Sequence, residues 1–437
     1  MSVLNSRLLT AILISTLGSG FQHGYHTGII NIPENIFRDW IFRILARRVD
    51  TVPDERDVNI IWSTTIAMFS VGGMLGGFLT SFFTNKCGCK GSLIWNNLIV
   101  VLGICILTVS QRVTSFELFM VGRFLVGINA GLNSGLCQMY LVDIAPLHIR
   151  GAVAGFYQLV ITLGILLSHC SSCFLGTAEA WPFMFVIALL PAAFQLLSLP
   201  FCPESPKYLL ITKEDETKAE KALQWLRKTT DVQHEMEQLK EEDNLVKELR
   251  PVTLKRMFTD VSLRSPLVVC LVLMFGQQLC GINAISIYFS TETFKEIGLE
   301  DRHGIYLTMS MGLLNVLATF LTLPLIDIFG RRTMLLTGFM GLSLDTIALT
   351  ITLVLAHKEG SAPFLKYLSI IFEFVFVLFF SPGIGTIPWF ITAEIFHHTA
   401  RTLGVSIAVI GNWFANYIVS QTFNVVKVSI RWDIMYF

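Results

Sequence analysis

The sequence predicts an all-α membrane protein built from two pseudo-symmetric helical bundles. Of its 437 residues, 53% are hydrophobic and 15% are charged, and the mean hydropathy is +0.62. Soluble domains do not have this composition, whereas a membrane-spanning helix needs about 20 consecutive apolar residues. Charged clusters also recur at matching points of the two halves: 143–150 corresponds to 394–401, and 86–90 to 327–332. Internal repeats in a multi-span chain are typical of secondary transporters, which move small solutes.

Eleven apolar segments follow one another, six before and five after a polar stretch at 203–264. They lie at approximately 8–30, 59–84, 92–110, 115–141, 152–173, 180–201, 265–289, 303–326, 333–356, 364–392 and 402–426. The polar stretch contains twelve Lys or Arg residues and has a helical composition over much of its length. The sequence therefore predicts an N-terminal six-helix bundle at 1–202, a helical domain at 203–264 and a C-terminal bundle at 265–437.

Lysine and arginine concentrate in the polar stretch and in the short loops at 84–91 and 327–332. Loops rich in these residues face the cytoplasm, so we expect an intracellular helical domain and a cytoplasmic N-terminus. The segment 31–58 conflicts with this rule, because it contains five arginines but falls on the external side by the alternation of spans.

Glycines and prolines inside the spans predict two local features. Glycines recur every four or five residues within 122–135, which lets neighbouring helices approach closely. Pro382, Gly383, Gly385 and Pro388 interrupt another span and free backbone groups, which a membrane protein tolerates only beside protein or an aqueous cavity. We expect a bent helix there that lines a solute path.

Composition and motifs disfavour several other classes of function. The formal net charge is zero, so no nucleic-acid partner is suggested. The nine cysteines are scattered, and the Cys170–Cys173 spacing has no second ligand pair, which favours packing over a metal or redox site. No nucleophile–base constellation is visible, so we expect neither an enzyme nor a cofactor.

The chain resembles the facilitative hexose transporters of the major facilitator superfamily. The resemblance rests on ordered motifs that cover nearly the whole chain: 122–131, 139–146 with 150–151, 203–210, 277–284, 330–332, and 387–390 followed by Glu394. It implies two six-helix bundles around a central sugar site, joined by an intracellular helical domain. It also implies a plasma-membrane protein that carries glucose or fructose by alternating access.

A sugar offers hydroxyl groups that both donate and accept, so its site calls for amides and indoles rather than charges. At positions matching the family's sugar contacts we expect Gln158, Gln277, Gln278, Asn283, Asn315, Trp389 and Asn412. Trp413 matches another family position beside the sugar. The competing interpretation is that such amides only join helices and that the tryptophans only pack.

The resemblance also implies a cytoplasmic gate in which charged residues pair across the two halves. The residues at those positions are Arg123, Asp143, Arg150, Glu204, Arg331, Arg332, Glu394 and Arg401. Pairs of this kind bias one conformation by at most a few kcal/mol, which suits a gate that must also open. The simpler alternative is that some of these charges only set the topology.

Several residues depart from the family pattern. Cys89 stands where the family has a gate arginine, and Ser381 replaces a glutamate. His26 replaces the asparagine of uniporters and the aspartate of proton-coupled relatives. Asp345 and Glu373 lie within spans, where ionisable residues are costly. These departures leave open a proton-coupled sugar transporter or a urate-type transporter.

No twelfth apolar span follows Asn416. The C-terminal bundle is therefore expected to lack its twelfth helix, which leaves a third possibility. The chain would then be a truncated, non-transporting form that associates with full-length relatives or other membrane proteins. A hexose and the lipid bilayer are the partners that the first interpretation implies.

Overall fold

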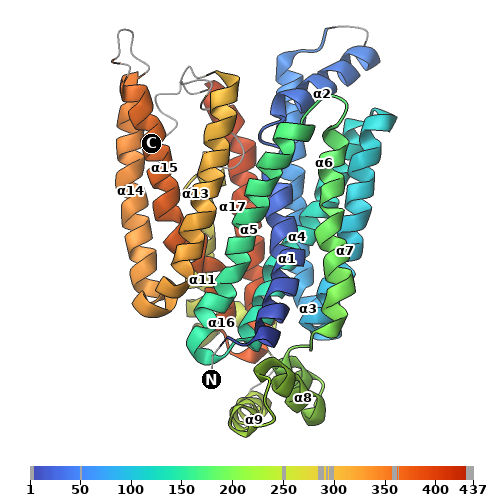
Figure 1. Cartoon of the computed structure of the whole chain (residues 1–437), viewed down its shortest axis with the longest axis vertical. Coiled ribbons are helices and arrows are strands. Elements are labelled where there is room, and N and C mark those ends of the chain that lie inside the picture. The colour runs from blue at the N-terminus through green and yellow to red at the C-terminus, as the bar shows by residue number, and fades with distance from the viewer. Residues whose placement is uncertain are drawn as a thin grey trace.

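The computed structural model is helical, and its helices run nearly parallel in two groups (Figure 1). It describes residues 4–49, 52–248, 252–283, 290–291, 294, 300–356, 362 and 364–429. The first group contains α1 (Ser6–Gly28), α3 (Glu55–Val113), α4 (Phe116–Ile144), α5 (Arg150–Leu175), α6 (Trp181–Ile187) and α7 (Leu189–Ser198). The second contains α11 (Val261–Leu279), α13 (Asp301–Phe329), α14 (Arg331–Ala356), α15 (Phe364–Phe380), α16 (Ile387–Glu394) and α17 (His398–Ser429).

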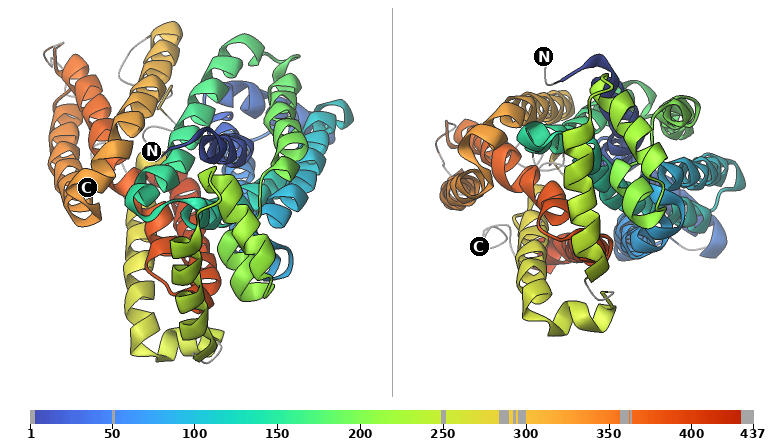
Figure 2. Two further views of the ribbon diagram at one scale, coloured as in Figure 1. Left: turned by 60° about the horizontal axis from the view of Figure 1, so that its bottom comes forward. Right: turned by 90° about the horizontal axis from the view of Figure 1, so that it is seen from below.

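Short helices cover the two ends of the molecule. The helices α8 (Glu216–Arg227) and α9 (Gln233–Glu248) lie at one end, which we call the domain end, and α10 (Leu254–Thr259) leads into α11. At the other end lies α2 (Glu34–Val49), and we call it the α2 end. Seen from the domain end, α9 crosses between the two groups of helices (Figure 2). The described residues of the polar stretch at 203–264 thus include these short helices, and its last residues belong to α11.

Two predicted spans form the single helix α3, which turns back on itself at Gly88. Gly88 has φ 73° and ψ 176°, a conformation that costs little only for glycine. A Cβ atom at this position would lie 2.4 Å from a carboxylate oxygen of Glu204. The predicted loop at 84–91 is therefore a tight turn that is fitted around the Glu204 side chain.

The arginine-rich segment 31–58 contains a helix, α2, rather than the expected external loop. Its apolar face packs on the first group: the Phe37 ring centroid lies 5.5 Å from that of Trp62 and 5.2 Å from that of Trp181. The Trp62 indole nitrogen donates a hydrogen bond to Glu34, 2.9 Å away. Aromatic packing thus orders this segment, which its arginines did not indicate.

Small residues bring helices into close contact, as the glycine pattern predicted. A Cβ atom on Gly127 of α4 would lie 2.1 Å from the Phe69 carbonyl oxygen of α3. Between the two groups, a Cβ atom on Gly73 of α3 would lie 2.2 Å from the Trp413 ring of α17. Ser406 of α17 donates a hydrogen bond to the carbonyl oxygen of Gly77. The two groups therefore touch directly along α3 and α17.

Eight helical stretches among the described residues are long and apolar enough to cross a membrane, with α3 counted once. The predicted spans in α1 and α4 fall outside these eight. Both helices are buried along most of their length and carry polar residues such as Gln22 and Asn129. A helix surrounded by other helices need not be apolar on every face, which explains the difference. Residues 284–289 of the seventh predicted span lie outside the described part.

Candidate functional site

Most of the predicted amides of the second half meet in one buried network. The Gln278 side-chain nitrogen donates to Asn412 Oδ1 at 3.0 Å, and Asn412 Nδ2 donates to Gln277 Oε1 at 2.8 Å. Asn283 also donates to Gln278 Oε1, as does Asn416 Nδ2 at 3.3 Å. The network joins α11, the segment after it, and α17. In this structure the amide groups serve as hydrogen-bond partners for one another.

Gln277 holds the bent helix that the proline and glycine pattern predicted. Between α15 and α16 the chain forms a π-helical turn, η5 (Ser381–Gly385). The two amide hydrogens of Gln277 bond the carbonyl oxygens of Ile384 and Gly385, at 2.8 and 3.0 Å. Ile384 lies four residues before Pro388, which has no N–H group to donate to it. We expected Gln277 to contact a solute, but in this structure its donors stabilise the bend instead.

Four deeply placed side chains keep polar atoms without a partner. Gln158 of α5 and the Trp389 indole nitrogen of α16 make no hydrogen bond to a described side chain or backbone group. Asn315 of α13 accepts from Ser381 at 2.9 Å, but its amide hydrogens have no acceptor among the described residues. Among the described residues, His23 of α1 has a hydrogen-bond partner at Nδ1 but none at Nε2.

These four residues are only 5–7% exposed, yet none of the free atoms is sealed from solvent. They come from both halves of the molecule. Partly solvent-accessible donors and acceptors from both groups of helices are therefore present inside the protein.

Aromatic rings surround this region. The His23 ring centroid lies 5.8 Å from that of Trp389 and 5.2 Å from that of Trp413. His23 Nδ1 lies 3.0 Å from the hydroxyl oxygen of Tyr157, whose ring is 6.3 Å from that of Trp389. Sequence reasoning missed His23 and Tyr157. The signal was present for His23, because an ionisable residue within a span is as costly there as at His26.

Arg123 does not belong to the gate, which corrects the sequence-based expectation. It lies on α4 twenty residues before Asp143, a separation of about 30 Å along a helix. Its guanidinium donates to the His26 carbonyl oxygen at 2.8 Å and lies 4.4 Å from the centre of the Phe69 ring. Arg123 therefore stabilises the part of the first half that is nearer the α2 end.

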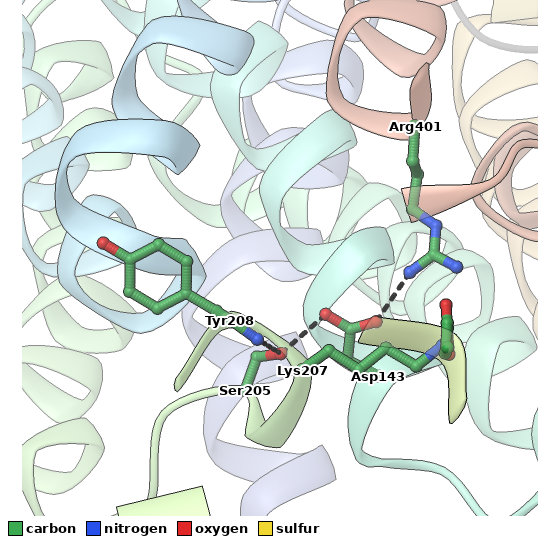
Figure 3. A network of polar contacts seen from close by, with 6 residues as sticks. Asp143, Ser205, Lys207, Tyr208 and Arg401 are labelled. Carbon is green, nitrogen blue, oxygen red and sulfur yellow. Dashed lines mark hydrogen bonds and ion pairs between the residues drawn. The ribbon is translucent and has the colours of Figure 1, made fainter. Parts of the chain in front are cut away.

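One ion pair joins the two halves at the domain end. Arg401 of α17 donates to a carboxylate oxygen of Asp143 at 2.8 Å, and the other oxygen accepts from the Ser205 hydroxyl at 2.7 Å (Figure 3). The side chains of Arg401 and Asp143 are 8% and 7% exposed. Lys207, close by, pairs with Glu242 of α9 at 2.9 Å. Because burial limits solvent screening, the Asp143–Arg401 pair is a strong link between the two halves at the domain end.

A second contact between the halves involves a residue that was not among the predicted gate residues. The Asp327 carboxylate accepts from the backbone N–H of Ala152 in the first turn of α5, at 2.9 Å. Arg331 pairs with Asp327 at 3.1 Å and with Glu394 at 3.3 Å. The charged repeat at 327–332 did signal this position. A carboxylate at a helix N-terminus is also favoured by the helix dipole.

The remaining predicted gate residues do not join this network. Glu204 accepts from the backbone N–H groups of Lys90 and Gly91, at 3.0 and 3.3 Å, and so stays within the first half. Burial raises the pKa of Glu204 above its ordinary value. Arg332 is exposed at the start of α14, and Arg150 forms no ion pair with a described residue.

A cavity of about 590 Å³ lies at the domain end, below the Asp143–Arg401 pair. Its lining comes from both halves and from α8 and α9, and Figure 2 shows α9 crossing between the two groups. Lys207 lies on the wall of this cavity. Burial lowers the pKa of Lys207 most, and the nearby positive charge of Arg401 lowers it further. No group of three or more metal-ligating side chains occurs in the part of the chain that the structure describes. All nine cysteines are free.

A known protein family and several known proteins match this chain over most of its length. The model of the sugar (and other) transporter family matches residues 11–437. Facilitated glucose transporter member 3 of solute carrier family 2 from Canis lupus familiaris is 37% identical over 418 residues, covering 95% of this chain and 83% of that protein. Member 1 from Gallus gallus is 36% identical over 424 residues, covering 97% and 85%.

Solved structures also match the fold of this chain. The proton:xylose symporter XylE bound to 6-bromo-6-deoxy-D-glucose aligns with a TM-score of 0.83 at 24% identity, covering 97% of this chain and 89% of that one. The inward open conformation of XylE from E. coli aligns with a TM-score of 0.73 at 23% identity, covering 98% and 92%. These two likenesses concern the fold alone.

Proposed function

Because this chain belongs to the sugar transporter family and has the fold of the major facilitator superfamily, we propose that it is a facilitative hexose transporter that works by alternating access. Glucose is the first candidate substrate, since the relatives described above are named facilitated glucose transporters. Fructose is the second.

The observation that carries this proposal is the set of free polar groups at the centre of the molecule. Gln158, Asn315, Trp389 and His23 offer neutral donors and acceptors from both halves. A hexose presents hydroxyl groups of matching chemistry and apolar C–H faces that suit tryptophan rings. The amide network behind them can exchange its internal hydrogen bonds for bonds to the sugar. Charges, which would select an ionic solute, are not among these four groups.

The charged contacts at the domain end supply the second requirement of alternating access, a gate. In this conformation the Asp143–Arg401 ion pair and the Asp327–Ala152 hydrogen bond close that end. Opening it requires both to break, while α3 and α17 remain in contact along Gly73 and Gly77. The sugar can then leave on the domain side.

We further assign the chain to the plasma membrane, with its N-terminus and the domain end in the cytoplasm. The concentration of Lys and Arg at 203–264 and in the turns at the same end supports this orientation. The long apolar helices support a multi-pass position in the lipid bilayer.

Proton coupling is the second candidate function, and four buried ionisable residues favour it. His26, His169, Asp345 and Glu373 are each less than 5% exposed, and their side-chain polar atoms have no partner in the described structure. Ionisable groups in such positions often carry protons in membrane transporters.

Uptake into vesicles separates the candidates. The purified chain is reconstituted into liposomes, and radiolabelled D-glucose, D-fructose and urate are supplied with and without an imposed acidic exterior. L-glucose and protein-free liposomes serve as controls. We expect saturable D-glucose uptake that stops at equal concentrations inside and outside. Accumulation above that level under the pH gradient would replace facilitation with proton coupling. Uptake of urate alone, or of no solute, would overturn the hexose proposal.

A further inference from the structure

We infer that His23 contacts the sugar directly and donates a hydrogen bond from Nε2 to one of its oxygens, with Tyr157 as the positioning residue. This inference rests on the proposed hexose transport and names a specificity-determining contact within that site. His23 is on α1, and its ring faces Trp389 and Trp413 from the other half, with centroids 5.8 and 5.2 Å away. The ring therefore lies where the two halves meet at the central site.

The Tyr157 hydroxyl determines which nitrogen of His23 carries the proton. Neutral imidazole has one N–H group and one bare nitrogen. Tyr157 is fully buried, and its hydroxyl has His23 Nδ1, at 3.0 Å, as its only hydrogen-bond partner among the described residues. If Nδ1 carried the hydrogen, the hydroxyl hydrogen would be left buried without an acceptor, which costs free energy. The phenol therefore donates, Nδ1 accepts, and the hydrogen resides on Nε2.

The Nε2–H group is then a donor with a fixed direction. Nε2 has no partner among the described residues, and it is not one of the polar atoms sealed from solvent. A free donor beside two indole rings requires an acceptor on the solute. Hydroxyl or ring oxygens of a hexose meet this requirement, and the rings can pack on its C–H faces. Because the Nε2–H group can only donate, it favours sugars that carry an oxygen at the facing position over sugars that lack this oxygen.

Sugar analogues that lack single hydroxyl groups test the contact. D-glucose and each of its monodeoxy and monofluoro analogues compete against radiolabelled D-glucose for uptake by reconstituted wild type and His23→Phe. Phenylalanine keeps the ring and removes both nitrogens. We expect His23→Phe to weaken the inhibition constant of D-glucose by about 5- to 100-fold, the loss expected for one unmade hydrogen bond to a solute. For the deoxy analogue that lacks the contacted hydroxyl group, the inhibition constant should be the same in the wild type and in His23→Phe.

The fluoro analogue at the same position sharpens the assignment. Fluorine still accepts weakly but does not donate, so in the wild type this analogue should bind between glucose and the deoxy sugar. Its advantage over the deoxy sugar should disappear in His23→Phe. The change should fall on the half-saturation concentration more than on the maximal rate, which a packing defect alone would not produce.

Two further variants keep the test decisive. Tyr157→Phe retains His23 but frees the tautomer, so discrimination at the same hydroxyl should weaken even if His23→Phe folds poorly. Tyr25→Phe is the matched control, because it removes a phenol on the same helix that bonds Ser171 and the Met184 carbonyl oxygen. It should keep the wild-type pattern. Equal weakening of all analogues in both test variants, or no change, would overturn the contact. Absence of wild-type uptake would instead overturn the hexose proposal on which it rests.

Discussion

Neutralising Asp143 should open the domain end. In the Asp143→Asn variant, Arg401 would remain buried without its counter-charge, while Ser205 would keep a hydrogen-bond partner. The nitrogen–oxygen distance of 2.8 Å corresponds to a gross attraction of about 6 kcal/mol at an effective dielectric constant near 20. Desolvation offsets part of this attraction. Removing one partner of a buried pair costs about 3–5 kcal/mol, because it leaves a charge uncompensated.

A cost of about 3 kcal/mol would shift the ratio of closed to open forms by about 150-fold. Amide hydrogen exchange in lipid nanodiscs measures this shift. We expect faster exchange in 143–152 and 394–401, and little change at the α2 end. Arg48→Gln is the matched control, since Arg48 pairs with Glu117 near the α2 end and both side chains are about half exposed. An exposed pair contributes only about 0–1 kcal/mol.

The charge-reversed double variant, Asp143→Arg with Arg401→Asp, should recover part of the lost protection. Unchanged exchange in Asp143→Asn, or an equal effect of Arg48→Gln, would refute the gate assignment.

Three other changes test the fold around the site. Gln277→Ala removes the side-chain donors to the carbonyl groups of Ile384 and Gly385 and should lower stability by about 1–3 kcal/mol, seen as a lower unfolding temperature; an unchanged temperature would contradict this role. Gly127→Ala places a methyl carbon 2.1 Å from the Phe69 carbonyl oxygen and should cost about 1–3 kcal/mol or more, whereas wild-type yield and unfolding temperature would refute the close approach. Burial raises the pKa of Glu204, so the folded protein binds the Glu204 proton more tightly than the unfolded chain does. The contribution of this proton to the free energy of unfolding is therefore fully present below the unfolded-state pKa of about 4.3, and it is lost as pH rises through the folded-state pKa. Wild type should therefore lose stability over that pH range relative to Glu204→Gln, and parallel curves of unfolding temperature against pH would exclude this effect.

The sequence predicted the arrangement of spans because membrane helices are read from long apolar runs, and these depend little on tertiary contacts. The break at η5 was predictable for a similar reason, since Pro382 and Pro388 limit the backbone wherever they occur. The packing of Gly127 followed from its spacing with other glycines. The repeated charged clusters also located Asp143 and Arg401 at one end, because such clusters follow topology.

The roles of individual side chains were harder to predict. Gln277 and Gln278 are adjacent and chemically identical, yet the side-chain nitrogen of Gln277 donates to the bent helix and that of Gln278 donates within the amide network. The two side chains differ in their position around the axis of α11, and this decides which groups each one reaches. Arg123 was misplaced because a motif gives a position along the chain, whereas the length of α4 carries it to the far side. His23 was missed because its significance depends on Tyr157 and two tryptophans from distant segments.

The turn of α3 at Gly88 makes the two halves unequal in stiffness. Two antiparallel spans meet at this turn, and the Glu204 carboxylate ties the backbone of the turn to the chain that follows α7. The second half has a similar turn at Gly330, with φ 78° and ψ 159°, but no described group lies within 4 Å of a Cβ position there. This half also contains η5, where one amide side chain bonds the backbone of the bend. We therefore expect the first half to rotate as a rigid body and the second half to bend at η5. The strain of each transport cycle would then concentrate beside the solute.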